Sequence, residues 1–219
     1  FMPPFVAIIF YIMFIAIVFG NEFRIKTSLS KAIWVPFIWM ALCASRSLTQ
    51  WLDIPADRQL SRIEGMLEGS PIDRAFLTLL IILGLFILWK RREQAFAILR
   101  NNKTILLLFL YLGISVMWSD VMEVSLRRWF RVLGGLLMVI IILTEDEPLE
   151  ALRFLFRACA YLLIPLSVVY VKYFPALAVS YTWCGAKFWT GVALQKNSLG
   201  HLCLVSIFFI FWSIITRRG

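Results

Sequence analysis

The hydrophobic pattern of the chain consists of long apolar runs separated by short polar segments. Seven of these runs approach the length of about 17 to 25 residues with which an α-helix crosses the hydrocarbon core of a bilayer, most of them once a few interfacial residues are included. The predicted spans are residues 3–20, 32–44, 72–89, 105–118, 128–143, 152–170 and 198–216. The pattern therefore predicts an all-α fold, a polytopic transmembrane helix bundle.

The run at residues 32–44 is the weakest of the seven, because it is short and is interrupted by Pro36. A kinked or re-entrant segment is the alternative at this position. The choice matters for topology, since the loss of one crossing would invert the orientation of every later span.

The polar segment between the second and third runs is predicted to contain a short interfacial helix. Pro55 and Asp57 suit a helix start, and apolar residues then recur at helical spacing up to Leu67 with charged residues between them. An amphipathic pattern of this kind is typical of a helix that lies in the headgroup plane. The turn Gly69-Ser-Pro71 then redirects the chain into the third span.

The densest basic cluster lies between the third and fourth spans, at residues 90–103. Dense clusters of Lys and Arg beside a span hold a loop in the cytoplasm. We therefore expect this segment on the cytoplasmic side, and the loops 45–74, 119–131 and 171–197 on the opposite, outer side. Tryptophans near the predicted boundaries agree with an aromatic belt at the membrane interfaces.

Composition supports the membrane assignment. Hydrophobic residues make up 61% of the 219 residues, charged residues 16%, and the mean hydropathy is +0.84, whereas soluble domains carry about 25% charged residues. The net charge of +9 is not attributed to nucleic acid, because most basic residues lie just outside apolar runs, where they anchor helices at lipid headgroups. The 4 cysteines are scattered, so neither a disulfide framework nor a metal site is predicted, and no cofactor is expected.

Three arginines, Arg127, Arg128 and Arg131, enter the apolar helix predicted around the fifth run instead of stopping outside it. A guanidinium at membrane depth is costly unless it is paired, faces water or meets an anionic ligand. Glu123 lies one helical turn before Arg127 and can pair with it. With Asp120, Glu123 resembles a capping box that would start the helix near Ser119. Two acids leave the segment positive, which suits a phosphate or pyrophosphate bound by bidentate guanidinium contacts; the alternative is that the arginines reach lipid headgroups and fix the depth of the helix.

A second polar constellation, Lys196-Asn197-Ser198 followed by His201, leads directly into the last apolar run. Asn197 or Ser198 can cap that helix, and its free N–H groups and dipole would then favour an anion, with Lys196 adding a full charge. His201 falls one turn inside and could exchange a proton near neutral pH. The alternative is a capped helix with an interfacial lysine and a hydrogen-bonded imidazole.

Together these segments resemble the bacterial O-antigen ligase and O-antigen polymerase family of polytopic membrane glycosyltransferases. The run from Trp118 to Arg128 reads W-S-x5-S-L-R-R, and the run from Gly191 to His201 reads G-x4-K-N-x2-G-H. The first is similar to a region of the family that precedes a span, and the second to the start of the family's shared ligase domain. The segment 68–74 before the third span is also similar to one in such proteins.

The resemblance implies a glycosyltransferase of the bacterial inner membrane that takes a glycan from an undecaprenyl-pyrophosphate carrier at the periplasmic face. Ligases of the family pass the glycan to a lipid A core, and polymerases pass it to a growing polysaccharide. The implied pyrophosphate-binding residues are Arg127, Arg128, Arg131, Lys196 and Asn197. His201 and Arg74 are auxiliary candidates, and the catalytic residue is not identified.

The resemblance also divides the chain into N-terminal transmembrane helices with outer loops, residues 1–189, and the beginning of a ligase-like domain, residues 190–219. The large periplasmic loop of the family, which bears the histidine proposed as base, comes later than this chain reaches, so His201 is not that histidine. The chain begins with Phe1 rather than Met, and its last apolar run ends within 3 residues of Gly219. We therefore expect a piece of a longer protein.

Two other functions fit the same features. A secondary transporter for an anionic or lipid-linked substrate would also place arginines and a helix N-terminus at a cavity, although transporters tend to show inverted repeats and helices broken near the midplane. A non-catalytic partner in the assembly of lipid-linked polysaccharide is the other alternative, because the catalytic loop is not part of this sequence.

Overall fold

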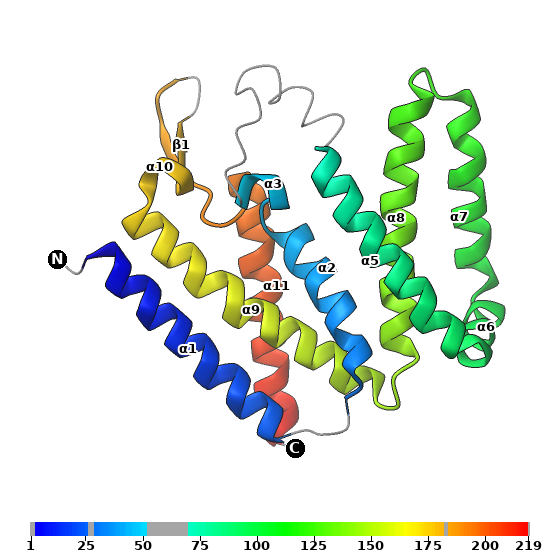
Figure 1. Cartoon of the computed structure of the whole chain (residues 1–219), viewed down its shortest axis with the longest axis horizontal. Helices are drawn as coiled ribbons and strands as arrows, with labels where there is room; N and C mark the ends of the chain where they lie inside the picture. Colours follow the sequence, from blue (N-terminus) through cyan, green and yellow to red (C-terminus); the bar gives the residue numbers. More distant parts are fainter. Residues whose placement is uncertain (1–2, 26–28, 52–69, 182–183, 219) are drawn as a thin grey trace. The chain divides into compact units, whose positions relative to one another are not determined.

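The computed structural model describes residues 3–25, 29–51, 70–181 and 184–218, and these residues are almost entirely helical (Figure 1). They belong to two compact units, which are described separately. The terminal unit comprises Phe1–Leu29, Met40–Arg46 and Leu149–Gly219, and the central unit comprises Ser30–Trp39 and Ser47–Pro148.

Within the described residues, the central unit contains seven complete helical elements and the first half of an eighth. These are η1 (Lys31–Ile33), the first half of α2 (Trp34–Ala44), α3 (Leu48–Trp51), α5 (Pro71–Lys90), α6 (Arg92–Asn101), α7 (Lys103–Ser115), η2 (Val116–Trp118) and α8 (Met122–Leu143). The terminal unit contains α1 (Pro4–Ile25), the second half of α2, α9 (Pro148–Tyr173), α10 (Pro175–Ala178), β1 (Val179–Tyr181), β2 (Lys187–Trp189) and α11 (Lys196–Arg218).

All seven predicted apolar runs are helical, which confirms the all-α prediction apart from one short hairpin of β1 and β2. Three helices in the described residues are long and apolar enough to cross a membrane by themselves, namely α5, α9 and the Lys196–Ile215 part of α11. The helices Arg92–Asn101 and Lys103–Trp118 qualify only as a pair, and the pair is bent by 88°. The structure thus supports a membrane helix bundle with three such helices, or four with the bent pair, and does not confirm seven crossings.

Two of the predicted connections between spans contain regular structure that was not predicted. Residues 90–103 contain the helix α6, and the expected outer loop 171–197 contains α10 and the β1–β2 hairpin. In the hairpin Val179 lies opposite Trp189, and Tyr181 lies opposite Lys187. The predicted interfacial helix between Asp57 and Leu67 falls outside the described residues.

The core of the central unit is a seam between α5 and α8. Gly84 of α5 lies against α8 so closely that a Cβ there would be 3.3 Å from side-chain atoms of Ile141 and Met138. Gly134 of α8 lies against the indole of Trp39, where a Cβ would be 2.9 Å from Cζ2. Small residues at these two contacts let the helix backbones approach, as is common where membrane helices pack.

The helices α7 and α8 form an antiparallel pair next to this seam (Figure 1). The indole of Trp129 lies over Gly113 and donates a hydrogen bond from Nε1 to the carbonyl of Phe109 at 3.2 Å. The apolar body of the indole thus packs while its N–H is satisfied within the unit, which a lipid environment requires.

The terminal unit is organised around α9. Tyr11 of α1 donates a hydrogen bond to the carbonyl of Leu162 at 2.9 Å, in the turn before Pro165. Phe156 of α9 stacks on Phe209 of α11, with ring centroids 3.7 Å apart and planes 9° from parallel. These contacts connect α1 and α11 to α9 without charged groups.

Candidate functional site at the arginine end of the central unit

The arginines of α8 lie in the first half of the helix. Arg127 shares the packing stripe of Gly134 and Met138, because residues seven or eleven apart recur on the same helical face. Its side chain is 37% exposed and lies 3.1 Å from the carboxylate of Glu123, which confirms the predicted pairing. Arg128 and Arg131 are exposed on neighbouring faces. Arg127 therefore belongs to the edge of the core, and the other two arginines reach outward.

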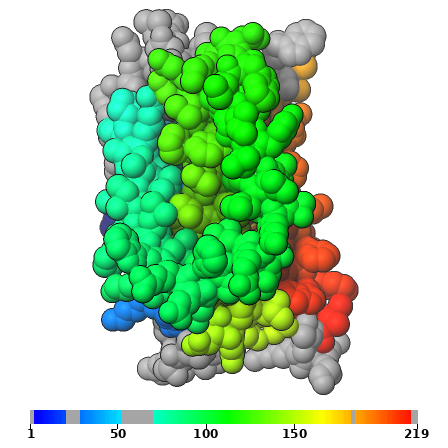
Figure 2. Space-filling model, turned by 90° about the vertical axis from the view of Figure 1, so that its right-hand side faces the viewer, coloured from blue at the N-terminus to red at the C-terminus, as the bar shows by residue number. Residues whose placement is uncertain are grey.

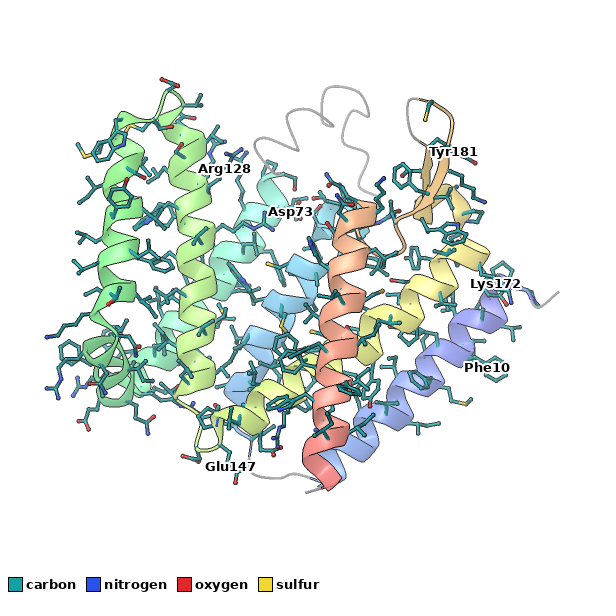
Figure 3. The ribbon with its side chains drawn as sticks, turned by 180° about the vertical axis from the view of Figure 1, so that it is seen from behind. Phe10, Asp73, Arg128, Glu147, Lys172 and Tyr181 are labelled. Carbon is teal, nitrogen blue, oxygen red and sulfur yellow. The ribbon has the colours of Figure 1, made fainter. Side chains whose placement is uncertain are left out.

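The seam places the beginnings of α5 and α8 at the same end of the central unit. Gly84 contacts Met138, and Arg91 contacts Glu145; in both contacts the partners are 54 residues apart, so the two helices run parallel. The same offset brings Asp73 of α5 to the level of Arg127. Figure 3 shows Asp73 and Arg128 near the same end of their helices.

Asp73 organises the start of α5. Its carboxylate accepts hydrogen bonds from the backbone N–H of Thr49 at 3.1 Å and from the Thr49 hydroxyl. Its own N–H donates to Ser70 Oγ at 3.2 Å, so Ser70 caps the helix. The short helix α3 is thereby attached to the N-terminus of α5, next to the half-buried Arg74.

The electrostatics of this end favour an anion. Both α5 and α8 present their N-termini here, and the positive ends of two helix dipoles add to the charges of Arg74, Arg127, Arg128 and Arg131. Glu123 is paired with Arg127, whereas Asp73, which accepts hydrogen bonds from Thr49, and the exposed Asp120 keep their charges. The four guanidinium groups outnumber these three carboxylates. Guanidinium groups at two parallel helix N-termini are the donors that a phosphate or pyrophosphate requires.

The predicted capping box at the start of α8 was wrong. The helix begins at Met122 with Val121 at the N-cap, and no side chain caps it. The hydroxyl of Ser119 instead lies 2.6 Å from that of Ser125. An N-terminus without a side-chain cap has backbone N–H groups available to an anion or to water.

The second predicted constellation belongs to the terminal unit. The helix α11 begins at Lys196, so Asn197 and Ser198 lie in its first turn and do not cap it as predicted. Lys196 Nζ lies 5.6 Å from the ring centroid of Phe188 in β2, a cation–π geometry. Asn197 and His201 are exposed. Lys196, Asn197 and His201 therefore form one group, in the terminal unit. The α8 arginines and Arg74 form a second group, in the central unit.

The segment before α11 is built on Gly191. Its φ of 57° and its approach to Ser167, where a Cβ would be 2.9 Å from the serine Cβ, both require glycine. The hydroxyl of Ser167 accepts a hydrogen bond from the N–H of Val192 at 3.3 Å. Arg46 donates to the carbonyls of Gly191 and Leu177, and burial lowers the pKa of its guanidinium.

A buried ionic network at the opposite end of the α5–α8 seam was not predicted. Glu145 is buried, and its carboxylate accepts from the backbone N–H of Ser30 at 3.1 Å, from the Ser30 hydroxyl at 2.6 Å and from Arg91 at 2.7 Å. Arg91 also donates to the carbonyl of Thr144 at 3.2 Å. Burial alone would raise the pKa of Glu145, but the hydrogen bonds from Ser30 and Arg91 outweigh it and lower the pKa. The sequence contained a signal for this pair, because Glu145 comes just after the apolar run 128–143 and Arg91 just after the run 72–89.

No group of three or more metal-ligating side chains occurs among the described residues. Comparison of the chain with family models, with curated proteins and with solved structures found no match.

Proposed function

We propose that the chain is part of a membrane glycosyltransferase that binds the pyrophosphate of a lipid-linked glycan at the N-terminal ends of α5 and α8. The observation that supports this proposal is the gathering of Arg74, Arg127, Arg128 and Arg131 at the end where two parallel helices begin. The resemblance to the O-antigen ligase and polymerase family supplies the substrate class, an undecaprenyl-pyrophosphate donor, and the periplasmic side of the inner membrane.

The arginines have distinct roles in this proposal. Arg127 is half-buried and is paired with the exposed carboxylate of Glu123, so it is assigned to the first phosphate. Arg128 and Arg131 are exposed and extend the positive surface to the second phosphate. Negative charge grows on the leaving pyrophosphate as the anomeric C–O bond breaks, so fixed guanidinium groups stabilise the transition state more than the bound substrate.

The group at the start of α11 belongs to the terminal unit. Lys196 and Asn197 are proposed as anion-binding residues there, with His201 as an auxiliary residue, and this assignment rests on the resemblance. The acceptor, a lipid A core or a growing polysaccharide, would be deprotonated by a base in a part of the protein beyond these residues. The residues of this chain are therefore proposed to bind the leaving pyrophosphate and not to act as the base.

A transporter is the second candidate, and the 88° break between α6 and α7 is the observation that favours it. Transporters place such breaks around the substrate site. Here the break lies at the end of the α5–α8 seam where Arg91 contacts Glu145. Arg74 and the α8 arginines, which are the proposed anion-binding groups, lie at the other end. The separation of the break from the anion-binding groups favours the transferase.

Arginine substitutions in the intact gene test the proposal. We expect Arg127→Gln with Arg131→Gln to abolish transfer of glycan to its acceptor at an unchanged protein level, because the leaving pyrophosphate loses its donors. Arg127→Lys keeps the charge but not the bidentate geometry and should retain only part of the activity. The matched control is Lys31→Gln, an exposed cation of the central unit. Normal transfer by the double variant would assign the arginines to headgroup anchoring.

A further inference from the structure

The helix α6 lies across the end of the central unit. It follows α5 after Arg91, and it makes an angle of 88° with the apolar helical segment Lys103–Trp118 that follows it. A segment of that length covers about 24 Å at 1.5 Å per residue, most of the hydrocarbon thickness. When this segment runs along the membrane normal, α6 lies in the membrane plane at the level of the headgroups.

The two faces of α6 differ in chemistry. Ala95 is buried, with Ile98 and Leu99 half-buried beside it, and these residues face the rest of the unit. Arg92, Phe96 and Arg100 recur every four residues on the outer side, where Phe96 is 69% exposed. Figure 2 shows this outer side uncovered in the lower part of the view.

A shallow groove runs along the outer side of α6. It has a volume of about 500 Å³ and is lined by Arg92, Glu93, Phe96, Ala97 and Arg100. Phe96 and Ala97 are at the middle of this set, and Arg92 and Arg100 are four residues before and after Phe96 along the helix. The groove therefore combines an apolar centre with cationic ends.

The residues that line the groove and flank α6 carry more positive than negative charge. Glu93 is the acid that lines it, while Lys90 and Lys103 lie just beyond the two ends of α6. The adjacent Arg91 is directed to Glu145 at 2.7 Å and so belongs to the core network instead. A basic amphipathic helix with an exposed aromatic ring is typical of a surface that binds anionic lipid.

We propose that the outer groove of α6 binds an anionic phospholipid. Arg92 and Arg100 would bind the phosphate groups, and Phe96 would contact the glycerol and the upper acyl chains. The site lies at the end of the α5–α8 seam opposite to the α8 arginines, so it does not depend on the function proposed for them. It would hold the bent pair of helices at the headgroup level.

Lipid titration of the purified full chain by native mass spectrometry tests the site. The probes are phosphatidylglycerol and, as zwitterionic reference, phosphatidylcholine with the same acyl chains. At about 1 kcal/mol per basic residue near an anionic lipid, Arg92→Gln with Arg100→Gln should weaken phosphatidylglycerol binding about 30-fold and leave phosphatidylcholine binding unchanged. The matched control, Lys172→Gln with Lys187→Gln, removes the same charge from exposed positions of the terminal unit and should change neither affinity.

Four further outcomes complete the test. Ala97→Trp fills the groove with both arginines intact, at an exposed position that disturbs no packing, and should also abolish the preference for phosphatidylglycerol. Competition by free glycerol phosphate as strong as that by the lipid would show a headgroup site without lipid contact and would overturn the proposal. A preference for phosphatidylglycerol that survives both the double arginine variant and Ala97→Trp would overturn the proposal. A dimer of the chain that Phe96→Ser dissociates would also overturn it, because the groove would then bind a second copy of the chain.

Discussion

The ionic network around Glu145 provides the sharpest test of the architecture, because one carboxylate connects three segments of the central unit. Glu145→Gln keeps the shape of the side chain and its hydrogen bond from the Ser30 hydroxyl, but it removes the charge that faces Arg91. Bonds to charged groups contribute about 1.5 to 3 kcal/mol each, and breaking a buried ion pair costs about 3 to 5 kcal/mol. Arg91 keeps 24% of its side chain exposed and its bonds to Thr144, so we expect a loss of about 2 to 3 kcal/mol.

The pH dependence gives a second, independent readout. The pKa of Glu145 in the folded chain lies below its ordinary value of 4.5, so its contribution is complete above pH 4.5 and is lost as the pH falls through the lowered pKa. The difference in unfolding free energy between wild type and Glu145→Gln should therefore be full at neutral pH and shrink in acid. Unfolding in mixed micelles with increasing sodium dodecyl sulfate, followed by tryptophan fluorescence, measures it.

The matched control for this prediction is the next residue. Asp146 is exposed, so Asp146→Asn should change the free energy of unfolding by about 0.5 kcal/mol or less. Equal stability of Glu145→Gln and wild type at neutral pH would refute the energetic reasoning. A difference that stays constant down to acid pH would refute the assignment of a lowered pKa.

Two packing predictions use the same unfolding assay. Gly134→Val should destabilise the central unit by about 1 to 3 kcal/mol, because the new side chain meets the Trp39 indole; a neutral effect would mean that the seam is open. Tyr11→Phe should cost about 1 kcal/mol, since it removes only the hydrogen bond to the Leu162 carbonyl, and an unchanged or raised stability would contradict that bond.

Helices were predictable from the sequence where hydrophobicity alone decides them. Each apolar run forms a helix, because a single apolar segment in lipid can hydrogen-bond all of its backbone N–H and C=O groups only within an α-helix. The helix α6 was missed because its charged residues suggested a cytoplasmic loop, although Ala95, Ile98 and Leu99 carry a helical repeat. Its end is set locally, because the side-chain amide of Asn102 donates a hydrogen bond to the carbonyl of Ile98 and the N–H of Asn102 donates to that of Leu99.

The site was predictable in part for a similar reason. The pairing of Glu123 with Arg127 is local, four residues along one helix, and was expected. The parallel alignment of α5 with α8, which brings Asp73 to the level of Arg127, depends on Gly84 and its contacts across the seam. Such long-range register leaves no periodic signal in one sequence.

Direct binding of the donor to the purified full chain is the measurement that tests the central claim. Polyprenyl pyrophosphate and polyprenyl monophosphate of equal length would be compared on wild type and on the chain with Arg127→Gln and Arg131→Gln. We predict that wild type prefers the pyrophosphate at least about tenfold and that the double variant loses this preference, at about 1.5 to 3 kcal/mol per charged hydrogen bond. Equal affinity of wild type for the two lipids, or an undiminished preference in the double variant, would contradict the proposed pyrophosphate site.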